Sequence, residues 1–251
     1  MMKNLLRLSL LLWSVTAVWA GTAVDPVPRD AAWMKRHEEF VSEARRGGID
    51  VLFLGDSITD FWRSTNPERG GKTIWDREFG ALKAANFGIS ADRTQHVLWR
   101  LRNGEAEGYQ PKVVVLLIGT NNTGLERDGA TIRNTTAEVV EGVTAVVNEL
   151  RARFPAAKIL FLAIFPRGEK DSPQRIQIVE INRQLAQLQD GRRVFFLDIG
   201  PKFLAPDGSI PRAVMPDLLH PSEKGYQIWA DAIREPLARL LRTPGPAGSQ
   251  P

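Results

Sequence analysis

The chain has 251 residues, of which 43% are hydrophobic and 25% are charged, and this composition excludes a disordered or fibrous protein. Its formal charge of +4 does not indicate a nucleic-acid partner, because no block of Lys and Arg with interleaved aromatic residues is present. Cysteine is absent, which excludes disulfides and a thiolate nucleophile, and three scattered histidines offer no metal-ligand spacing. We therefore expect neither a metal nor a cofactor.

Residues 1–20 have the pattern of a secretory signal peptide. Lys3 and Arg7 precede an apolar run that ends at Val18, and the small residue Ala20 follows at the cleavage position. The run is too short to span a bilayer comfortably, although an uncleaved anchor is the alternative. The sequence predicts a secreted or periplasmic protein with no integral membrane span after signal cleavage.

The mature chain is predicted to form one domain. Two prolines and a lack of apolar periodicity predict an extended linker over residues 21–30, and Pro and Gly predict a disordered tail over 243–251. The domain then covers residues 31–242. It begins with a helix over 31–46, which two glycines end.

Five apolar runs in this domain predict strands that are buried on both faces, because the runs are continuous rather than alternating. They cover residues 51–54, 84–87, 113–118, 159–164 and 194–198. The segments between and after them carry apolar residues at helical spacing. Pro236 should bend or interrupt the last helix. Alternation of strand and helix predicts an α/β fold with a parallel, doubly wound sheet that has helices on both faces.

Polar, glycine-rich segments follow the strands, at the edge where open parallel sheets bind ligands. "GDS" contains Ser57 after the first strand, "GIS" begins at Gly88 after the second, and "GTNN" contains Asn121 after the third. Late in the chain, Asp217 stands three residues before His220, just ahead of a helix that a serine could cap. A serine nucleophile needs a histidine base and a carboxylate that orients the base, so these residues are candidates for a catalytic triad.

Donors to a tetrahedral oxyanion are also predicted at this edge. The candidates are the backbone N–H groups of Ser57 and Gly88 and the side-chain amide of Asn121. Each residue alone has an ordinary interpretation as a turn former, a helix cap or a surface residue. These ordinary interpretations would all have to hold at one edge of one sheet, which favours the catalytic hypothesis.

The remaining charged residues have simpler interpretations. His37 stands beside two glutamates and is expected to be solvated, whereas His96 is expected to support the loop that carries Gly88. Arg167 is expected in an exposed loop, with a place at the substrate rim as the alternative.

Four segments resemble the four sequence blocks of the GDSL, or SGNH, hydrolases, in the same order. They are "GDSITDFW", "NFGISADRTQHVLWRLRNGE", "PKVVVLLIGTNNTG" and "DLLHPSEKGY". The resemblance covers roughly residues 50–241 and is strongest to the platelet-activating-factor acetylhydrolase branch and its bacterial relatives. It implies a flavodoxin-like sheet, no cofactor and a site made of Ser57, Gly88, Asn121 and His220 with Asp217 as the triad carboxylate. It also allows a homodimer.

Two features depart from that branch. Ser90 and Ala91 stand where a second glycine is usual, and the export signal differs from the intracellular enzymes. The resemblance further implies that Ile58, Thr120 and Leu219 wall the acyl pocket, which would leave room for acetyl or little more.

The sequence thus predicts an exported serine esterase that removes short acyl groups from an alcohol, with a small-molecule or glycan ester as substrate. Export favours acetylated glycans, and the resemblance favours acetylated lipids. A sugar substrate would need polar groups around Arg93, Arg167 and Asn122, whereas a lipid would need an exposed apolar patch. The alternatives are a non-catalytic carbohydrate-binding module of the same fold and a phosphate binder, although "GDSIT" is short for a phosphate loop.

Overall fold

Five parallel strands form the centre of the structure, a computed structural model that describes residues 23–243. Their order across the sheet is β2-β1-β3-β4-β5, so the first strand lies between the second and the third. The strands are β1 (Val51–Gly55), β2 (Ala84–Gly88), β3 (Val113–Leu117), β4 (Lys158–Leu162) and β5 (Val194–Leu197). The fold class predicted from the sequence is confirmed, and each strand end differs from its predicted position by at most two residues.

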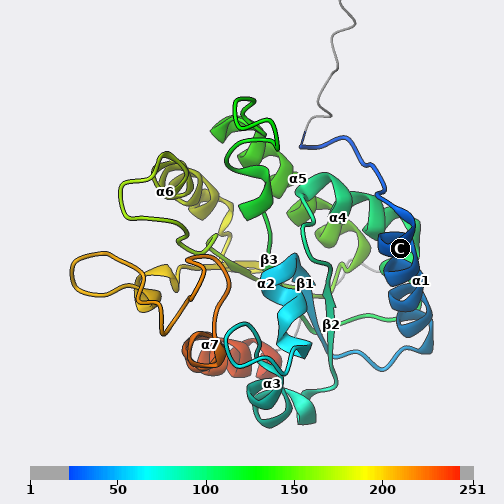
Figure 1. Ribbon diagram of the computed structural model, residues 1–251. Helices are drawn as coiled ribbons and strands as arrows, with labels where there is room; N and C mark the ends of the chain where they lie inside the picture. Colours follow the sequence, from blue (N-terminus) through cyan, green and yellow to red (C-terminus); the bar gives the residue numbers. More distant parts are fainter. Residues whose placement is uncertain (1–22, 244–251) are drawn as a thin grey trace, which may run out of the picture.

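Helices cover both faces of this sheet (Figure 1). One face packs against α1, α4, α5 and α6, and the other face packs against α3 and α7. The helices are α1 (Ala31–Arg46), α2 (Ser57–Asp60), α3 (Lys72–Glu78), α4 (Thr94–Arg100), α5 (Thr136–Arg153), α6 (Pro173–Leu185) and α7 (Glu223–Arg242). Short 3₁₀ or π turns cover Phe61–Arg63, Gly80–Leu82, Leu101–Glu105, Thr120–Asn122, Ala186–Leu188 and Gly200–Phe203.

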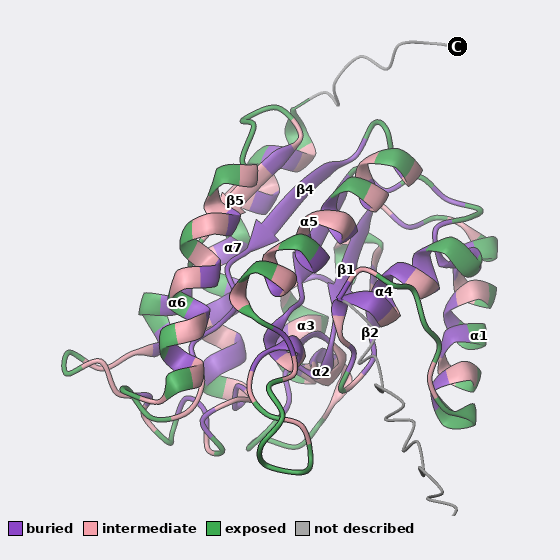
Figure 2. Ribbon diagram, turned by 90° about the horizontal axis from the view of Figure 1, so that it is seen from above, coloured by how far each residue is buried: buried purple, intermediate pink, exposed green. Residues whose placement is uncertain are grey.

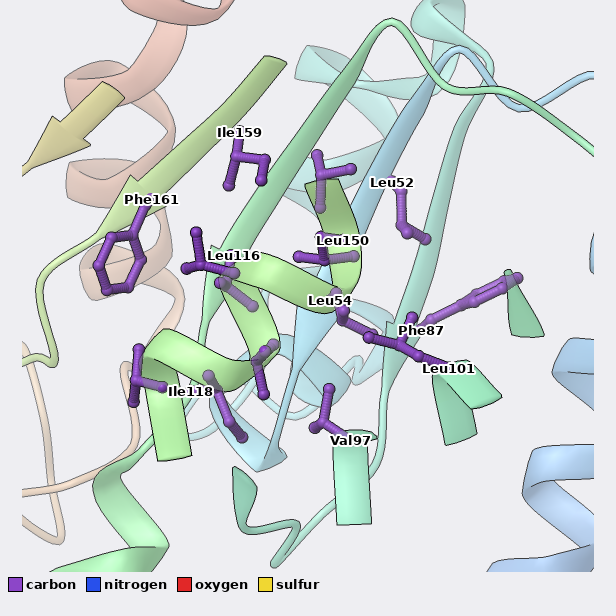
Figure 3. Packing of buried hydrophobic residues seen from close by; sticks show 14 of the residues in the cluster. Leu52, Leu54, Phe87, Val97, Leu101, Leu116, Ile118, Leu150, Ile159 and Phe161 are labelled. Carbon is purple, nitrogen blue, oxygen red and sulfur yellow. The ribbon is translucent and has the colours of Figure 1, made fainter. Parts of the chain in front are cut away.

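Successive residues of β1 serve the two different layers. Leu52 and Leu54 point into the cluster beneath α4 and α5, together with Leu116 of β3 (Figure 3). Val51 and Phe53 belong to the cluster on the opposite face. This is why the strand sequences are continuously apolar. Figure 2 shows the result, in which β1, β3 and β4 are buried, the edge strands β2 and β5 are partly exposed, and the helices expose their outer sides.

The last helix differs from its prediction. α7 runs from Glu223 to Arg242 without interruption, although it contains Pro236. Proline removes one intrahelical hydrogen bond, but Ile233 and Leu237 on either side of it are buried against the sheet, and this packing holds the helix together. Ser222 caps the helix as predicted, because its Oγ accepts a hydrogen bond from Gly225 N at 3.3 Å.

The described part of the predicted linker follows α4 closely. Thr94 Oγ1 donates to Ala23 O at 2.7 Å, and Val27 N donates to Gln95 O. The predicted signal peptide (1–20) and nearly all of the predicted tail lie outside the described residues. Between residues 23 and 243, no helix is long and apolar enough to cross a membrane.

Candidate active site

Ser57 lies directly beyond the carboxyl end of β1, as the first residue of α2. The turn requires glycine at position 55, because a Cβ atom there would lie 2.2 Å from Leu117 O. Asp56 then caps α2, accepting a hydrogen bond from Ile58 N at 3.0 Å. As the first helical residue, Ser57 has no intrahelical acceptor for its own N–H.

The structure brings His220 and Asp217 to Ser57. His220 Nε2 lies 2.9 Å from Ser57 Oγ, and His220 Nδ1 lies 2.6 Å from Asp217 Oδ2. A carboxylate can only accept, so Nδ1 carries a proton and Nε2 is free to accept the hydroxyl proton of Ser57. The residues thus form one continuous hydrogen-bonded chain from carboxylate to hydroxyl.

A tight turn holds the carboxylate against the imidazole. Leu218 adopts a left-handed backbone conformation with φ of 59°, and Asp217 Oδ1 accepts hydrogen bonds from Leu219 N at 3.0 Å and His220 N at 2.7 Å. Burial alone would raise the pKa of Asp217, but hydrogen bonds from the ring and backbone of His220 outweigh it and hold this pKa below its usual value. Asp217 therefore stays ionised beside the imidazole.

Contacts from other segments fix this turn. Gly168 N donates to Leu218 O at 2.8 Å, and the Phe61 ring lies 5.0 Å from the His220 ring, centroid to centroid. Tyr226 on α7 donates to Ile58 O on α2 at 2.7 Å. The helix that carries the serine and the helix that follows the histidine are thus joined directly.

The structure gives Gly88 a different role from the predicted one. Its N–H donates to Asn86 Oδ1 at 2.9 Å and is therefore already used. A Cβ atom at Gly88 would lie 2.2 Å from Asp60 N, so glycine is needed there for the close approach of α2 to β2. We do not count the Gly88 N–H among the donors that could face an oxyanion.

Ala91, three residues later, has a backbone N–H with no hydrogen-bond acceptor among residues 23–243. Its φ of 65° is left-handed, the region that glycine adopts most easily. Ala91 and Asn121 line the same cavity. The sequence signal that could have identified Ala91 is its place where the resembling branch has a second glycine.

Two neighbouring asparagines lie in different environments. Asn121 is half-buried and donates one amide hydrogen to Asp92 O at 3.0 Å, which leaves the second hydrogen unused. Asn122 is completely buried, and its side chain bonds to Thr94 and Asn134. Asn122 therefore links α4 to the segment before α5, and its buried side chain is not available to the polar rim that a sugar substrate would need.

The expected acyl-pocket residues come from three separate segments, namely α2, the turn after β3 and the turn before α7. Ile58 is 1% exposed, Thr120 is 2% exposed and Leu219 is half-buried. Arg167 donates to both Thr120 O and Thr120 Oγ1 at 3.2 Å. Arg167 is therefore half-buried behind Thr120 rather than in a fully exposed loop.

The expectation of a solvated His37 is wrong. His37 is 4% exposed, with Nδ1 at 2.8 Å from Glu105 Oε1 and Nε2 at 3.0 Å from Asn103 O. Glu105 also accepts from Arg100, which in turn pairs with Asp92 at 2.9 Å. This buried ionic network underlies the loop between β2 and α4.

His96 supports the loop between β2 and α4, which is the role that the sequence predicted for it. Its Nδ1 accepts a hydrogen bond from Arg93 N at 2.9 Å. Burial, together with the charges of Arg29, Arg93 and Arg100, lowers the pKa of His96 to about 3. His96 is therefore neutral at physiological pH.

Sequence reasoning also did not predict that the Asp56 side chain is buried. Its side chain is fully buried, and Oδ2 has no hydrogen-bond partner among the described residues. Burial, with a smaller contribution from the nearby Asp92 carboxylate, raises the pKa of Asp56 to about 7. Within residues 23–243, no group of three or more His, Cys, Asp or Glu side chains could hold a metal ion.

Comparisons with known proteins agree with this architecture. Residues 53–228 match the model of the GDSL-like lipase/acylhydrolase family. The chain is 38% identical to the platelet-activating factor acetylhydrolase IB subunit alpha1 of Homo sapiens over 221 residues, which cover 88% of this chain and 89% of the human one.

Two solved structures share the fold. A GDSL-like lipase of Bacteroides thetaiotaomicron is similar with a TM-score of 0.63 and 17% identity, covering 81% of this chain and 97% of its own. An acetylxylan esterase of Geobacillus stearothermophilus is similar with a TM-score of 0.58 and 21% identity, covering 78% and 95%. The chain belongs to the GDSL-like lipase/acylhydrolase family and is a carboxylic ester hydrolase.

Proposed function

We propose that the protein is a serine esterase that removes short acyl groups, chiefly acetyl, from an alcohol. The observation that carries the proposal is the hydrogen-bonded chain in which Ser57 Oγ lies 2.9 Å from His220 Nε2 and His220 Nδ1 lies 2.6 Å from Asp217. This hydrogen-bonded chain already contains the base that removes the proton from Ser57 during attack, so no further proton acceptor is needed.

The reaction proceeds through an acyl-enzyme. Ser57 Oγ attacks the ester carbonyl carbon as its proton moves to His220 Nε2, and Asp217 stabilises the imidazolium. The tetrahedral intermediate collapses when the bond between carbon and alcohol oxygen breaks, and His220 returns the proton to the leaving alcohol. Water then attacks the acyl carbon with His220 again as base, which releases the acid and restores Ser57.

The negative oxygen of the intermediate needs donors at its own position. We assign this role to the N–H groups of Ser57 and Ala91 and to the Asn121 amide hydrogen that Asp92 O does not use. All three follow neighbouring strands at the same edge of the sheet. Ala91 replaces Gly88 in this assignment because the Gly88 N–H already donates to Asn86.

The acyl preference follows from the walls beside Ser57. Ile58 and Thr120 are branched and buried, and the Arg167 side chain behind Thr120 keeps that wall in place. The names of the similar proteins indicate acetylated lipids or acetylated xylan as their substrates, and we propose an acetylated glycan or lipid for this chain.

The first experiment measures hydrolysis of p-nitrophenyl acetate, butyrate and octanoate by the wild type, by Ser57→Ala and by Ser42→Ala. Ser42 is exposed on α1 and serves as the matched control. We expect acetate to react fastest, Ser57→Ala to abolish turnover, and Ser42→Ala to match the wild type. Equal rates for wild type and Ser57→Ala would refute the proposal and favour a non-catalytic carbohydrate-binding module.

We further propose that residues 1–20 direct export to the periplasm or the medium. The support is their sequence pattern alone, a basic start followed by an apolar run and a small-residue end. Amino-terminal sequencing of the protein purified from its native compartment should find Gly21 as the first residue. A chain that still begins at Met1 would contradict cleavage.

A further inference from the structure

A cavity of about 590 Å³ adjoins the proposed site, because Ala91 and Asn121 line it. It lies between the loop after β2, which contributes Ala91 and Arg93, and the segment after β3, which contributes Asn121. Residues from the segment 126–133 complete it, and this part of the chain is the green loop between β3 and α5 at the top of Figure 1. Asn121 is thus shared between the proposed oxyanion site and the cavity.

The lining of this cavity is strongly charged. Four arginines line it together with only two carboxylates, and the buried Asp92 behind the lining pairs with one of the four, Arg29, at 3.0 Å. The arginines are Arg29, Arg93, Arg127 and Arg133. We call this space the arginine cavity.

The two lining carboxylates do not neutralise the arginines. Glu126 Oε1 and Oε2 lie 2.7 and 2.9 Å from the two Nη atoms of Arg93, and the same carboxylate lies 3.7 Å from Arg133 Nε. One carboxylate is thus shared by two guanidinium groups. Asp128 is used by its own turn, where it accepts hydrogen bonds from Ala130 and Thr131.

Arg127 is the lining cation that is most available to a ligand. Its side chain is exposed and forms no ion pair within the described residues. Arg133 donates one hydrogen bond to Asn121 O, and its Nε has no hydrogen-bond partner in the described part of the chain. His96 at the base of the cavity is neutral, so it adds no charge of its own.

We propose that the arginine cavity binds a negatively charged group on the alcohol half of the ester, a carboxylate or a phosphate. Guanidinium forks match either group with paired hydrogen bonds, and a neutral or apolar group would desolvate the arginines without compensation. The acyl group occupies the opposite side, between Ile58 and Leu219. This inference rests on the proposed esterase function, because it assigns a subsite to the same reaction.

The experiment compares two matched pairs of acetate esters at low ionic strength, with acetate release as the readout. The first pair is acetylated methyl glucuronide and acetylated methyl glucoside, which differ by a carboxylate. The second pair is acetylglycerol phosphate and acetylglycerol, which differ by a phosphate. We expect the charged ester of at least one pair to have a kcat/KM roughly tenfold above its neutral partner, and the pair with the larger ratio identifies the anion.

Two variants test whether the arginine cavity causes the preference. Arg127→Gln should lower the ratio of charged to neutral ester roughly threefold, because an exposed charge contributes only modestly to binding. Arg192→Gln removes the same charge from an exposed position next to the amino end of β5, and should leave the ratio unchanged. Added salt should reduce the wild-type ratio, since it screens exposed charges.

The inference is overturned if neither charged ester is preferred, or if Arg192→Gln lowers the ratio as much as Arg127→Gln. These failures are separate from a failure of the proposed function. If Ser57-dependent hydrolysis of p-nitrophenyl acetate is present while both ratios are near one, only the arginine cavity loses its assignment. If no ester is hydrolysed, the esterase proposal fails and the subsite fails with it.

Discussion

Asp56 next to the proposed nucleophile should make the stability of this protein depend on pH. Its carboxyl is fully buried with one oxygen unpaired among the described residues, and burial raises its pKa from 3.8 to about 7. Folding therefore increases the affinity of this group for its proton. The resulting stabilisation is complete below the unfolded pKa of 3.8 and is lost as the pH rises through 7.

The magnitude follows from the size of the pKa change. An increase from 3.8 to about 7 corresponds to about 4 kcal/mol at 1.36 kcal/mol for each pKa unit. Between about pH 5 and pH 8, the wild type should lose about 3 kcal/mol of this stabilisation. Asp56→Asn keeps an oxygen that can accept from Ile58 N and cannot ionise, so it should not lose this contribution.

Urea unfolding of the wild type and of Asp56→Asn at both pH values gives the comparison. Asp92, whose burial raises its pKa to about 6, contributes its own pH dependence, which is common to the two proteins apart from its interaction with the Asp56 charge. The free energy of unfolding of Asp56→Asn relative to the wild type should therefore rise by about 3 kcal/mol from pH 5 to pH 8. If this difference is independent of pH, Asp56 ionises freely in the folded protein and our account of its burial is incorrect.

Three further substitutions test the site and its support. Asp217→Asn should lower kcat for p-nitrophenyl acetate roughly ten-thousandfold by changing the His220 tautomer, and kcat within tenfold of the wild type would remove Asp217 from the mechanism. Asn121→Ala should lower kcat roughly a hundredfold to a thousandfold with KM little changed, whereas a rise in KM alone would assign Asn121 to ground-state binding. Glu105→Ala leaves the buried Arg100 without one partner and should cost about 3–5 kcal/mol in urea unfolding. The exposed Glu107→Ala is its control, and an equal loss in both would refute a special role for the buried pair.

The sheet and the triad were predictable because their signals are local. Each strand is a run of apolar residues that can be recognised without its neighbours. The residues of the hydrogen-bonded chain stand in short strings, Ser57 after β1 and the Asp217–His220 turn before α7. The parallel topology then brings the residues that follow the strands together, because the carboxyl ends of all the strands lie at one edge of the sheet.

Other features depend on partners that are distant in the sequence. His37 appears polar beside two glutamates, yet its actual partner is Glu105, 68 positions away. The Gly88 contact is close in the sequence but was also not predicted. The Gly88 N–H donates to the side chain of Asn86, and this contact depends on the backbone geometry at the end of β2. Pro236 disfavours a helix locally, but tertiary packing on both sides of it outweighs that cost.

The separation of Ser57 from His220 also determines when activity can arise during folding. Their side chains meet across 163 positions of sequence, and α7 must dock before the histidine is held in place. A chain still leaving the ribosome, or one cut before α7, would have the proposed nucleophile without its proposed base. Recovery of esterase activity during refolding should therefore lag behind burial of Trp33 on α1, which belongs to the core cluster on the face of the sheet opposite α7, and would report completion of the whole domain.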